Sequence, residues 1–123
     1  MNEKTCAIMI KRYDASPAEI SEKLEAALQN GCVHFLSGLE YGTGLSAAEA
    51  ILARKAACPF LTLECVIPFE EYTSAWDEPS RDRYFAILSR CDRETMLQTH
   101  YSPDCMARQR AYLLLHGDVS LEI

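Results

Sequence analysis

The sequence predicts an α/β fold: one three-layer, Rossmann-like domain built on a mostly parallel sheet of five strands. Short apolar segments of strand length alternate along the chain with segments whose apolar residues recur at helical spacing. Strands that alternate with helices are joined by right-handed crossovers, which leave the strands parallel. No internal repeat or low-complexity linker interrupts this alternation, so residues 1–123 are interpreted as a single domain.

The first strand and the first helix have well-marked ends. Residues 6–10 form a short apolar run of strand length. Ser16 is then a suitable N-cap, Pro17 suits the first helical position, and Glu19 completes a capping box. Gly31 follows the last apolar residue of helical spacing, and a glycine there commonly ends a helix in the left-handed conformation. A helix from Ser16 to about residue 30 is therefore expected.

The next three elements surround a glycine-rich loop. Residues 32–36 form a second apolar strand, and residues 37–44 follow it as the loop. The segment 46–49 has the pattern of another capping box, so a helix is expected to begin there and to end before Pro59. Apolar residues then alternate over 61–67, which predicts a third strand.

The last part of the chain contains weaker signals. Residues 68–79 are acidic and aromatic, and their pattern does not distinguish a short helix from a flap. Beyond them the sequence predicts a helix beginning at Ser80, a weak strand over 94–98, a helix from Ser102 to His116 closed by Gly117, and a strand over 119–123.

The simplest doubly wound arrangement of these strands is the order 3-2-1-4-5. It places the third strand at an edge of the sheet. Thr62 and Glu64 are polar residues within that strand, and an edge tolerates them better than a central position covered by helices on both faces.

Composition excludes several classes of function. The hydrophobic fraction of 49% with only 5 Gly and 5 Pro excludes a disordered or fibrous chain. A net charge of -6 repels duplex nucleic acid and anionic membranes, so neither is expected as a partner. No apolar run approaches the roughly 20 residues of a membrane span. The segment 1–4 also lacks the apolar part of a signal peptide, and a cytoplasmic location is expected.

The six cysteines are scattered without a C-x-x-C motif, and several lie in apolar segments. Reduced thiols are therefore expected. Cys91, His100 and Cys105 have side chains that suit zinc, but their spacing is looser than that of structural zinc sites. No metal and no cofactor is predicted.

The glycine-rich loop is the main candidate for a ligand site, because ligands of open parallel sheets bind beyond the carboxyl ends of the strands. Gly38, Gly42 and Gly44 would let the backbone approach a ligand. The Ser37 and Thr43 hydroxyls could bind phosphate or ribose oxygens, and the dipole of the following helix favours an anion. Equally, the glycines could serve only to shape a tight connection. They match neither the dinucleotide-binding pattern nor a Walker loop.

Two further groups could contribute to this site. Arg108 lies near the start of the last helix, where its guanidinium could pair with a phosphate, whereas Arg110 is better interpreted as part of a solvated helix face. Trp76 and Tyr72 could stack on a base, although a lone Trp more often anchors an irregular segment to the core.

The sequence contains little that indicates catalysis. There is no G-x-S-x-G motif, and His34 lies within an apolar strand, where a core or sheet-face position is the simplest interpretation. Glu70 and Glu71 follow the third strand and are the best-placed carboxylates for acid or base chemistry, but neighbouring glutamates usually belong to a solvated loop. No catalytic residue is assigned.

Several blocks, in the same order along nearly the whole chain, resemble the YpsA-like family of the SLOG superfamily, whose relatives include DNA-processing protein A and the Lonely-guy phosphoribohydrolases. The blocks that carry the resemblance are Lys4 to Ala7, Phe35 to Gly38 with Gly42, Ala47 to Glu49, Cys65 to Glu71, Trp76, Arg81 to Tyr84, Ile87 with Leu88, and Tyr101 to Pro103 with Cys105 and Met106.

The resemblance implies a Rossmann-type domain that binds a nucleotide or a nucleotide-derived ligand over the glycine loop. The residues that it places around such a ligand are Ser37, Gly38, Gly42, Glu49, Glu70 and Arg108.

The sequence departs from the family pattern in four respects. Of a G-H-R-P block after the first strand only Arg12 remains, and a family aspartate in the glycine loop falls at Gly44, so two polar contacts are expected to be absent. An R-N-R-Y-x-x-D run is replaced by residues 108–115, and the chain stops before a second glycine loop could follow. An incomplete pocket is expected.

Three hypotheses follow. The first is a module that binds a nucleotide derivative. The second is a degenerate paralogue that serves as an interaction subunit, such as a homodimer formed through the apolar last helix. The third is an enzyme that cleaves the glycosidic bond of a nucleotide, although the P-G-G-x-G-T-x-x-E signature of Lonely-guy enzymes is absent and only the spacing from Gly44 to Glu49 resembles its end.

Overall fold

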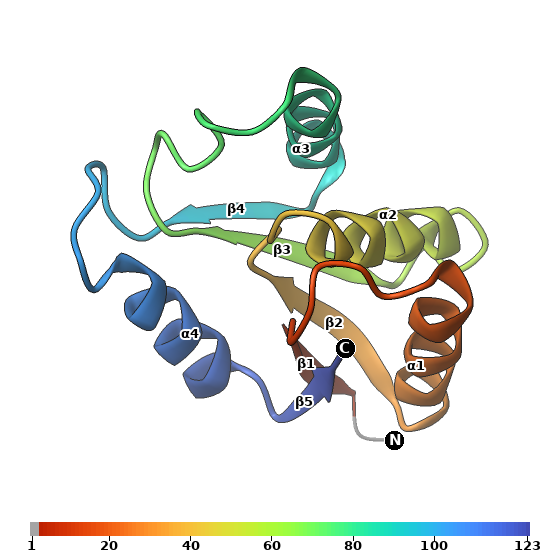
Figure 1. Ribbon diagram of the computed structural model, residues 1–123. Helices are drawn as coiled ribbons and strands as arrows, with labels where there is room; N and C mark the ends of the chain where they lie inside the picture. Colours follow the sequence, from red (N-terminus) through yellow and green to blue (C-terminus); the bar gives the residue numbers. More distant parts are fainter. Residues whose placement is uncertain (1–2) are drawn as a thin grey trace.

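The computed structural model describes residues 3–123 and confirms the predicted fold class: a parallel sheet of five strands with helices on both faces (Figure 1). The elements are β1 (Lys4–Met9), α1 (Pro17–Gln29), β2 (Cys32–Ser37), α2 (Thr43–Lys55), β3 (Thr62–Ile67), α3 (Glu78–Arg90), β4 (Arg93–Met96), α4 (Cys105–His116) and β5 (Val119–Glu122). All four neighbouring pairs of strands are parallel.

The strand order is β4-β3-β2-β1-β5, so the expected order 3-2-1-4-5 is wrong in the position of β4. In the expected order, β4 follows β3 in the chain but lies on the other side of β1. In the structure β4 lies next to β3, and only β5 lies on the other side of β1. The turn before β4 explains this position. The amide of Leu63 donates to a carboxylate oxygen of Asp92 (2.8 Å), and the amide of Asp92 donates back to the carbonyl of Leu63 (2.9 Å). These bonds hold the start of β4 beside β3.

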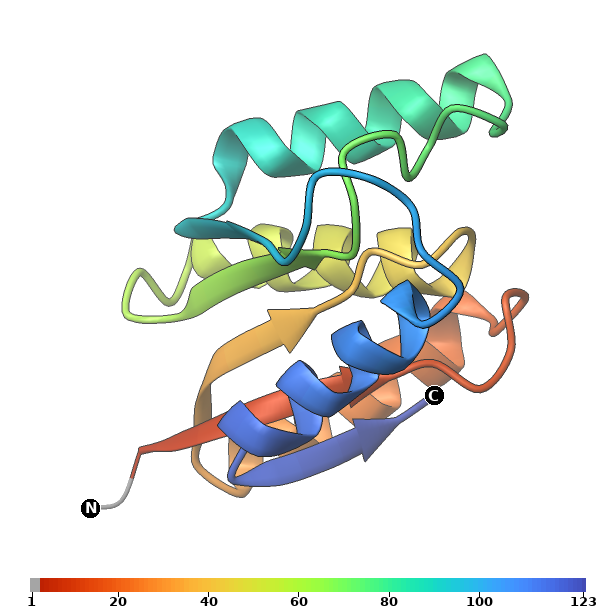
Figure 2. The same ribbon diagram turned by 90° about the vertical axis from the view of Figure 1, so that its left-hand side faces the viewer.

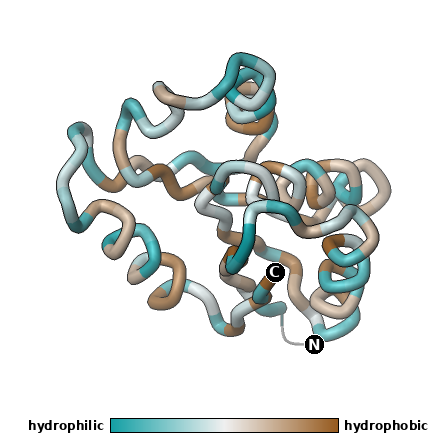
Figure 3. Tube along the Cα trace, in the orientation of Figure 1, coloured by the Kyte–Doolittle hydropathy of each residue, from teal (hydrophilic) through white to brown (hydrophobic). Residues whose placement is uncertain are grey.

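Because only β5 lies beyond β1, the two faces of the sheet carry different numbers of helices. Right-handed crossovers from β1 to β4 place α1, α2 and α3 on one face, and α4 crosses the other face alone (Figures 1 and 2). Each face has its own apolar cluster. The larger one includes Phe35 and Leu63 under α1, α2 and α3, whereas the smaller one joins Met9, Val66 and Leu113 under α4. Figure 3 shows hydrophobic stretches along the strands and in the last turn of α4.

Glu64 is therefore not on an edge strand. Its carboxylate accepts hydrogen bonds from the Thr95 hydroxyl of β4 (2.7 Å) and the Tyr112 hydroxyl of α4 (2.6 Å). Together with Thr62, it lies on a half-open part of the sheet face that also includes His34 and Arg93. These polar residues are tolerated because α4 covers this face only in part.

Capping residues and glycines in the sequence predicted both ends of α1 correctly, but they predicted the starts of α2 and α3 only approximately. Ser16 accepts from the Glu19 amide (3.1 Å), and Gly31 has φ +92°, as expected. The helix α2 begins at Thr43, before the expected start, because its first turn is capped by the backbone of the glycine loop. Asp77, rather than Ser80, caps α3 and accepts from the Ser80 amide.

Two more features complete the fold. The segment 68–77 consists of turns, and the helix α4 begins after Asp104, slightly later than expected. Within residues 3–123, no helix is both long and apolar enough to cross a membrane.

Replacing Phe35 by alanine tests the location of the core. Phe35 is 0% exposed in the larger cluster, so Phe35→Ala should lower the free energy of unfolding by about 3–5 kcal/mol in urea titrations. The matched change Phe60→Ala removes a side chain that is 62% exposed and should cost less than about 1 kcal/mol. Equal losses for the two variants would contradict this packing.

Candidate ligand-binding site

The glycine loop joins β2 to α2 at the carboxyl edge of the sheet and is tied to the loop that follows β1. Of the predicted residues 37–44, Ser37 ends β2 and Thr43 begins α2, so the connection itself is residues 38–42. The Thr43 amide donates to the Tyr13 carbonyl (2.9 Å), and the Ala15 amide donates to the Thr43 hydroxyl (3.0 Å). Gly42 has φ +75°, and a Cβ there would lie 2.2 Å from the Tyr13 carbonyl oxygen. Only glycine allows this close approach.

The predicted hydroxyl groups shape this loop and do not face solvent. Ser37 and Thr43 are both buried. The Ser37 hydroxyl accepts from the amide of Leu39 (3.1 Å), which has φ +50°. A positive φ is unfavourable for leucine, so the Ser37 contact helps to hold a strained backbone in place.

A carboxyl group that the sequence did not single out lies over this loop. A Cβ at Gly44 would lie 2.9 Å from Oε1 of Glu40, and a Cβ at Gly38 would lie 3.2 Å from its Cδ. The missing side chains of these two glycines therefore make room for the carboxyl group. The resemblance assigns a family aspartate to position 44, and in this chain the Glu40 carboxyl lies beside that position.

The environment of the Glu40 carboxyl is unusual. The residue as a whole is half-buried, but Oε1 is inaccessible to solvent and has no hydrogen-bond partner within residues 3–123. Burial raises the pKa of Glu40 from 4.5 to about 7, because the charged form loses its hydration. A buried polar atom without a partner is costly, and it marks a place where a ligand or water could bind. The one signal in the sequence is an acidic residue within a glycine-rich loop.

Gln109 of α4 holds the glycine loop from the other side. Its side-chain amide donates to the carbonyl of Gly38 (3.1 Å) and to the carbonyl of Val66 in β3 (2.8 Å). The residue is buried, so both bonds are shielded from water. They join α4, the glycine loop and the end of β3 into one unit.

A cavity of about 340 Å³ lies between α4 and the carboxyl end of β1. It adjoins the boundary between β1 and β5, where the direction of the strand order reverses, and open α/β sheets bind ligands at such points. Its walls combine apolar groups with the Glu40 carboxyl and one guanidinium, and include Met9, Ile10, Glu40, Met106, Gln109 and Arg110. Arg110 forms no ion pair within the part of the chain that the structure describes.

The charged residues expected at the site lie outside this cavity. Glu49 is held by Arg83, whose Nη2 and Nε lie 2.6 and 3.0 Å from the two carboxylate oxygens. This contact joins α2 to α3 and raises the pKa of Arg83. Glu70 is exposed, and Arg108 pairs with Asp104 at the surface (2.8 Å). Arg110 is exposed, as the sequence predicted, and it is also the arginine that lines the cavity.

The aromatic residues anchor the segment 68–77. Trp76 packs edge-on against Tyr41, Tyr72 and Tyr84, with ring centroids 5.3 to 5.7 Å apart. The Tyr41 hydroxyl donates to Asp77 (2.7 Å), which ties the glycine loop to the start of α3. Trp76 therefore has the packing role that the sequence favoured.

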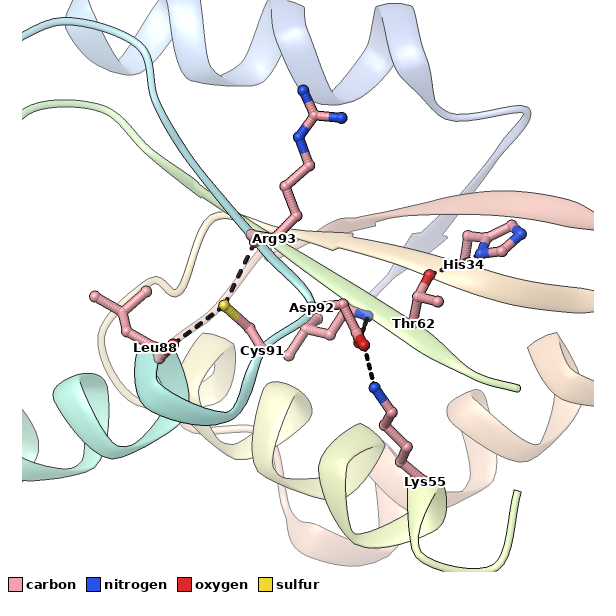
Figure 4. A network of polar contacts seen from close by, with 8 residues as sticks. His34, Lys55, Thr62, Leu88, Cys91, Asp92 and Arg93 are labelled. Carbon is pink, nitrogen blue, oxygen red and sulfur yellow. Dashed lines mark hydrogen bonds and ion pairs between the residues drawn. The ribbon is translucent and has the colours of Figure 1, made fainter. Parts of the chain in front are cut away.

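A second polar network lies away from the carboxyl edge (Figure 4). His34 contacts the Thr62 hydroxyl (2.7 Å) on the sheet face, as expected, and Lys55 pairs with Asp92. The Cys91 thiol lies within hydrogen-bond distance of two backbone carbonyls, at 3.3 and 3.4 Å. The contacts of Asp92 and Cys91 stabilise the start of β4, and that of His34 with Thr62 joins β2 to β3. Within residues 3–123 no three His, Cys, Asp or Glu side chains converge to hold a metal ion.

Comparison with known families agrees with the fold and the blocks described above. The profile named YpsA, which describes the YspA SLOG family, matches residues 11–123. The chain belongs to this family. The UPF0398 proteins of Levilactobacillus brevis and Leuconostoc citreum are similar to it, with 28% identity over 106 residues and 25% over 121 residues. The UPF0398 protein YpsA of Bacillus subtilis is 35% identical over 81 residues.

The alignments cover this chain more fully than they cover its YpsA-family relatives. They include 85%, 97% and 66% of this chain in the order given, but 56%, 61% and 44% of the relatives. The chain thus spans 56% and 61% of the length of the first two.

The raised pKa of Glu40 predicts a dependence of stability on pH. In the folded state the carboxyl keeps its proton up to about pH 7, whereas in the unfolded state it loses it near pH 4.5. The folded state therefore binds more protons between these values, and stability should fall as the pH rises through this range, by at most about 3 kcal/mol. Urea unfolding at about pH 5 and about pH 7.5 measures the difference.

Glu40→Gln should abolish most of this loss, because the amide does not ionise. The matched control Glu70→Gln alters an exposed glutamate and should retain the loss. A Glu40→Gln variant with the same pH dependence as the unmodified protein would disprove the assignment.

Proposed function

We propose that this domain binds a nucleotide or nucleotide-derived small molecule in the cavity between α4 and the carboxyl end of β1. The observation that carries this proposal is the Glu40 carboxyl, whose Oε1 is buried without a partner beside that cavity. Glu40 lines the cavity, and a small rotation of its side chain would turn Oε1 from its closed position toward a ligand. A hydrogen bond donated by the ligand would then relieve the cost of burying this atom. No catalytic step is part of the proposal.

The rest of the cavity is consistent with such a ligand. A volume of about 340 Å³ falls within the range of small-molecule sites. The apolar walls formed by Met9, Ile10 and Met106 suit the face of a base or a ribose, and Arg110 suits a phosphate. Because the whole chain carries a charge of -6, an anionic ligand requires a local cation of this kind.

The hypothesis of a glycosidic-bond hydrolase depends on Glu49. The geometry around Glu49 favours this hypothesis less than it favours ligand binding without catalysis. Both carboxylate oxygens of Glu49 are occupied by Arg83 between α2 and α3. Glu49 also does not line the cavity beside Glu40.

Titration with nucleoside monophosphates tests the binding proposal. AMP, GMP, CMP and UMP are added separately, and heat and thermal stability are recorded, because a ligand that binds the folded state raises its melting temperature. At least one should bind. Arg110→Ala should weaken its affinity about tenfold or more, since the loss of a charged hydrogen bond costs about 1.5–3 kcal/mol.

Arg108→Ala is the matched control, because Arg108 lies on the same helix and its guanidinium pairs with Asp104 and does not line the cavity. It should leave the affinity within about twofold, as expected for an exposed charge outside the site. Failure of all four nucleotides to bind, or equal losses in the two arginine variants, would overturn the proposal.

A second candidate function, self-association through α4, is favoured by a different observation. Leu114 and Leu115, in the last turn of the helix, are 50% and 79% exposed. Exposed apolar residues in one place often belong to interfaces. Light scattering should then show a mass twice the 13.8 kDa of one chain, and Leu115→Gln should shift the population to the monomer. A monomeric unmodified protein at high concentration would exclude this role.

A further inference from the structure

We propose that Glu40 determines which end of the ligand lies over the glycine loop: an uncharged hydrogen-bond donor binds there, and the phosphate binds at Arg110. Donors of this kind in a nucleotide are the ribose hydroxyls and the amino group of a base. The inference rests on the proposed function and adds the orientation of the ligand, which is opposite to a phosphate cradled by the glycine loop.

The first argument is that the chain itself fills the place where a phosphate would bind. The Glu40 carboxyl lies over Gly44, in the first turn of α2, with Oε1 2.9 Å from the position of a Cβ on that glycine. Above about pH 7 the Glu40 carboxyl is ionised, and a phosphate in contact with it would bring a second negative charge into a site shielded from water. Like charges at such a distance repel strongly where the dielectric constant is low.

The second argument concerns the backbone amides of the same turn. A phosphate at a helix N-terminus is bound by amides that have no other partner. Here the amide of Thr43 donates to Tyr13, that of Leu45 donates to the Glu40 carbonyl, and that of Ser46 donates to the Gly42 carbonyl. The start of α2 is therefore largely satisfied by its own chain.

The third argument is that Glu40 and Arg110 require different partners. A carboxylate accepts hydrogen bonds and a guanidinium donates them, so a hydroxyl or amino group suits the first and a phosphate suits the second. Both groups line the same cavity of about 340 Å³, so a single molecule with a donor at one end and a phosphate at the other can contact both. This combination is the chemistry of a nucleoside monophosphate.

The test compares Glu40→Gln with the unmodified protein at about pH 8, where the Glu40 carboxyl is ionised, using the tightest-binding nucleoside monophosphate and inorganic phosphate as probes. Glutamine has the shape of glutamate but lacks the charge and one acceptor. We expect about tenfold weaker binding of the nucleotide, equivalent to one lost hydrogen bond. We also expect Arg110→Ala to remove the preference for the monophosphate over its nucleoside. Glu70→Gln, the same change at an exposed residue outside the cavity, should leave the affinity unchanged.

Two further probes distinguish the sources of the donor. If a ribose hydroxyl contacts Glu40, the 2′-deoxynucleotide should bind less tightly than the ribonucleotide to the unmodified protein but equally to Glu40→Gln. If a base amino group does so, the analogue without that group should show this pattern instead, with IMP replacing a purine nucleotide and UMP replacing CMP.

The opposite result would overturn the inference. If a phosphate lies against Glu40, removing the negative charge should strengthen the binding of both the nucleotide and inorganic phosphate. Equal affinity of Glu40→Gln and the unmodified protein would also overturn it, and in both cases the proposed function would stand. If no nucleotide binds the unmodified protein, both proposals fail. Unfolding curves confirm that the variants are folded.

Discussion

Close packing of the glycine loop against the loop after β1 and against α4 determines the architecture of the carboxyl edge. Gly42 lets the Tyr13 carbonyl reach the first amide of α2, and Gln109 binds the loop from the opposite side. Between these contacts, the absence of side chains at positions 38 and 44 leaves room for the Glu40 carboxyl. The glycines therefore serve two purposes: they shape a tight connection, and they admit an acidic group of the same chain.

The position of α4 connects this loop to the rest of the fold. Because the chain reverses direction only after β4, α4 crosses the second face of the sheet alone. Its inner side supplies Gln109 to the loop and Leu113 to the smaller apolar cluster. Arg110 then lies at the cavity, whereas Arg108, half a helical turn away, points to solvent and pairs with Asp104. The position of α4 over the sheet thus places Arg110, and not Arg108, at the cavity.

The family comparison establishes what kind of protein this is, and the geometry of the structure indicates where a ligand could bind. The match over residues 11–123 establishes YpsA-family membership and a Rossmann-like fold. The curated relatives that are similar to this chain are longer, so the proposed site concerns only the region that they share with it. Within that region, an unpartnered buried carboxyl oxygen and a cavity with one guanidinium are the features that a small ligand could use.

The sequence alone was sufficient for the fold class, the alternation of strands and helices, and the ends of α1, because these depend on periodicity and on contacts between residues close in sequence. It also located the glycine loop. The sequence could not determine the position of β4 or the ion pair of Glu49 with Arg83. It also could not determine that Arg110, and not Arg108, lines the cavity. These depend on segments distant in sequence: Asp92 meets Leu63, Arg83 meets Glu49, and Gln109 meets Gly38. Glu40 shows why the sequence was not sufficient for the site. By its sequence it is an ordinary loop residue, and only packing against Gly38 and Gly44 buries its carboxyl and places it at the cavity.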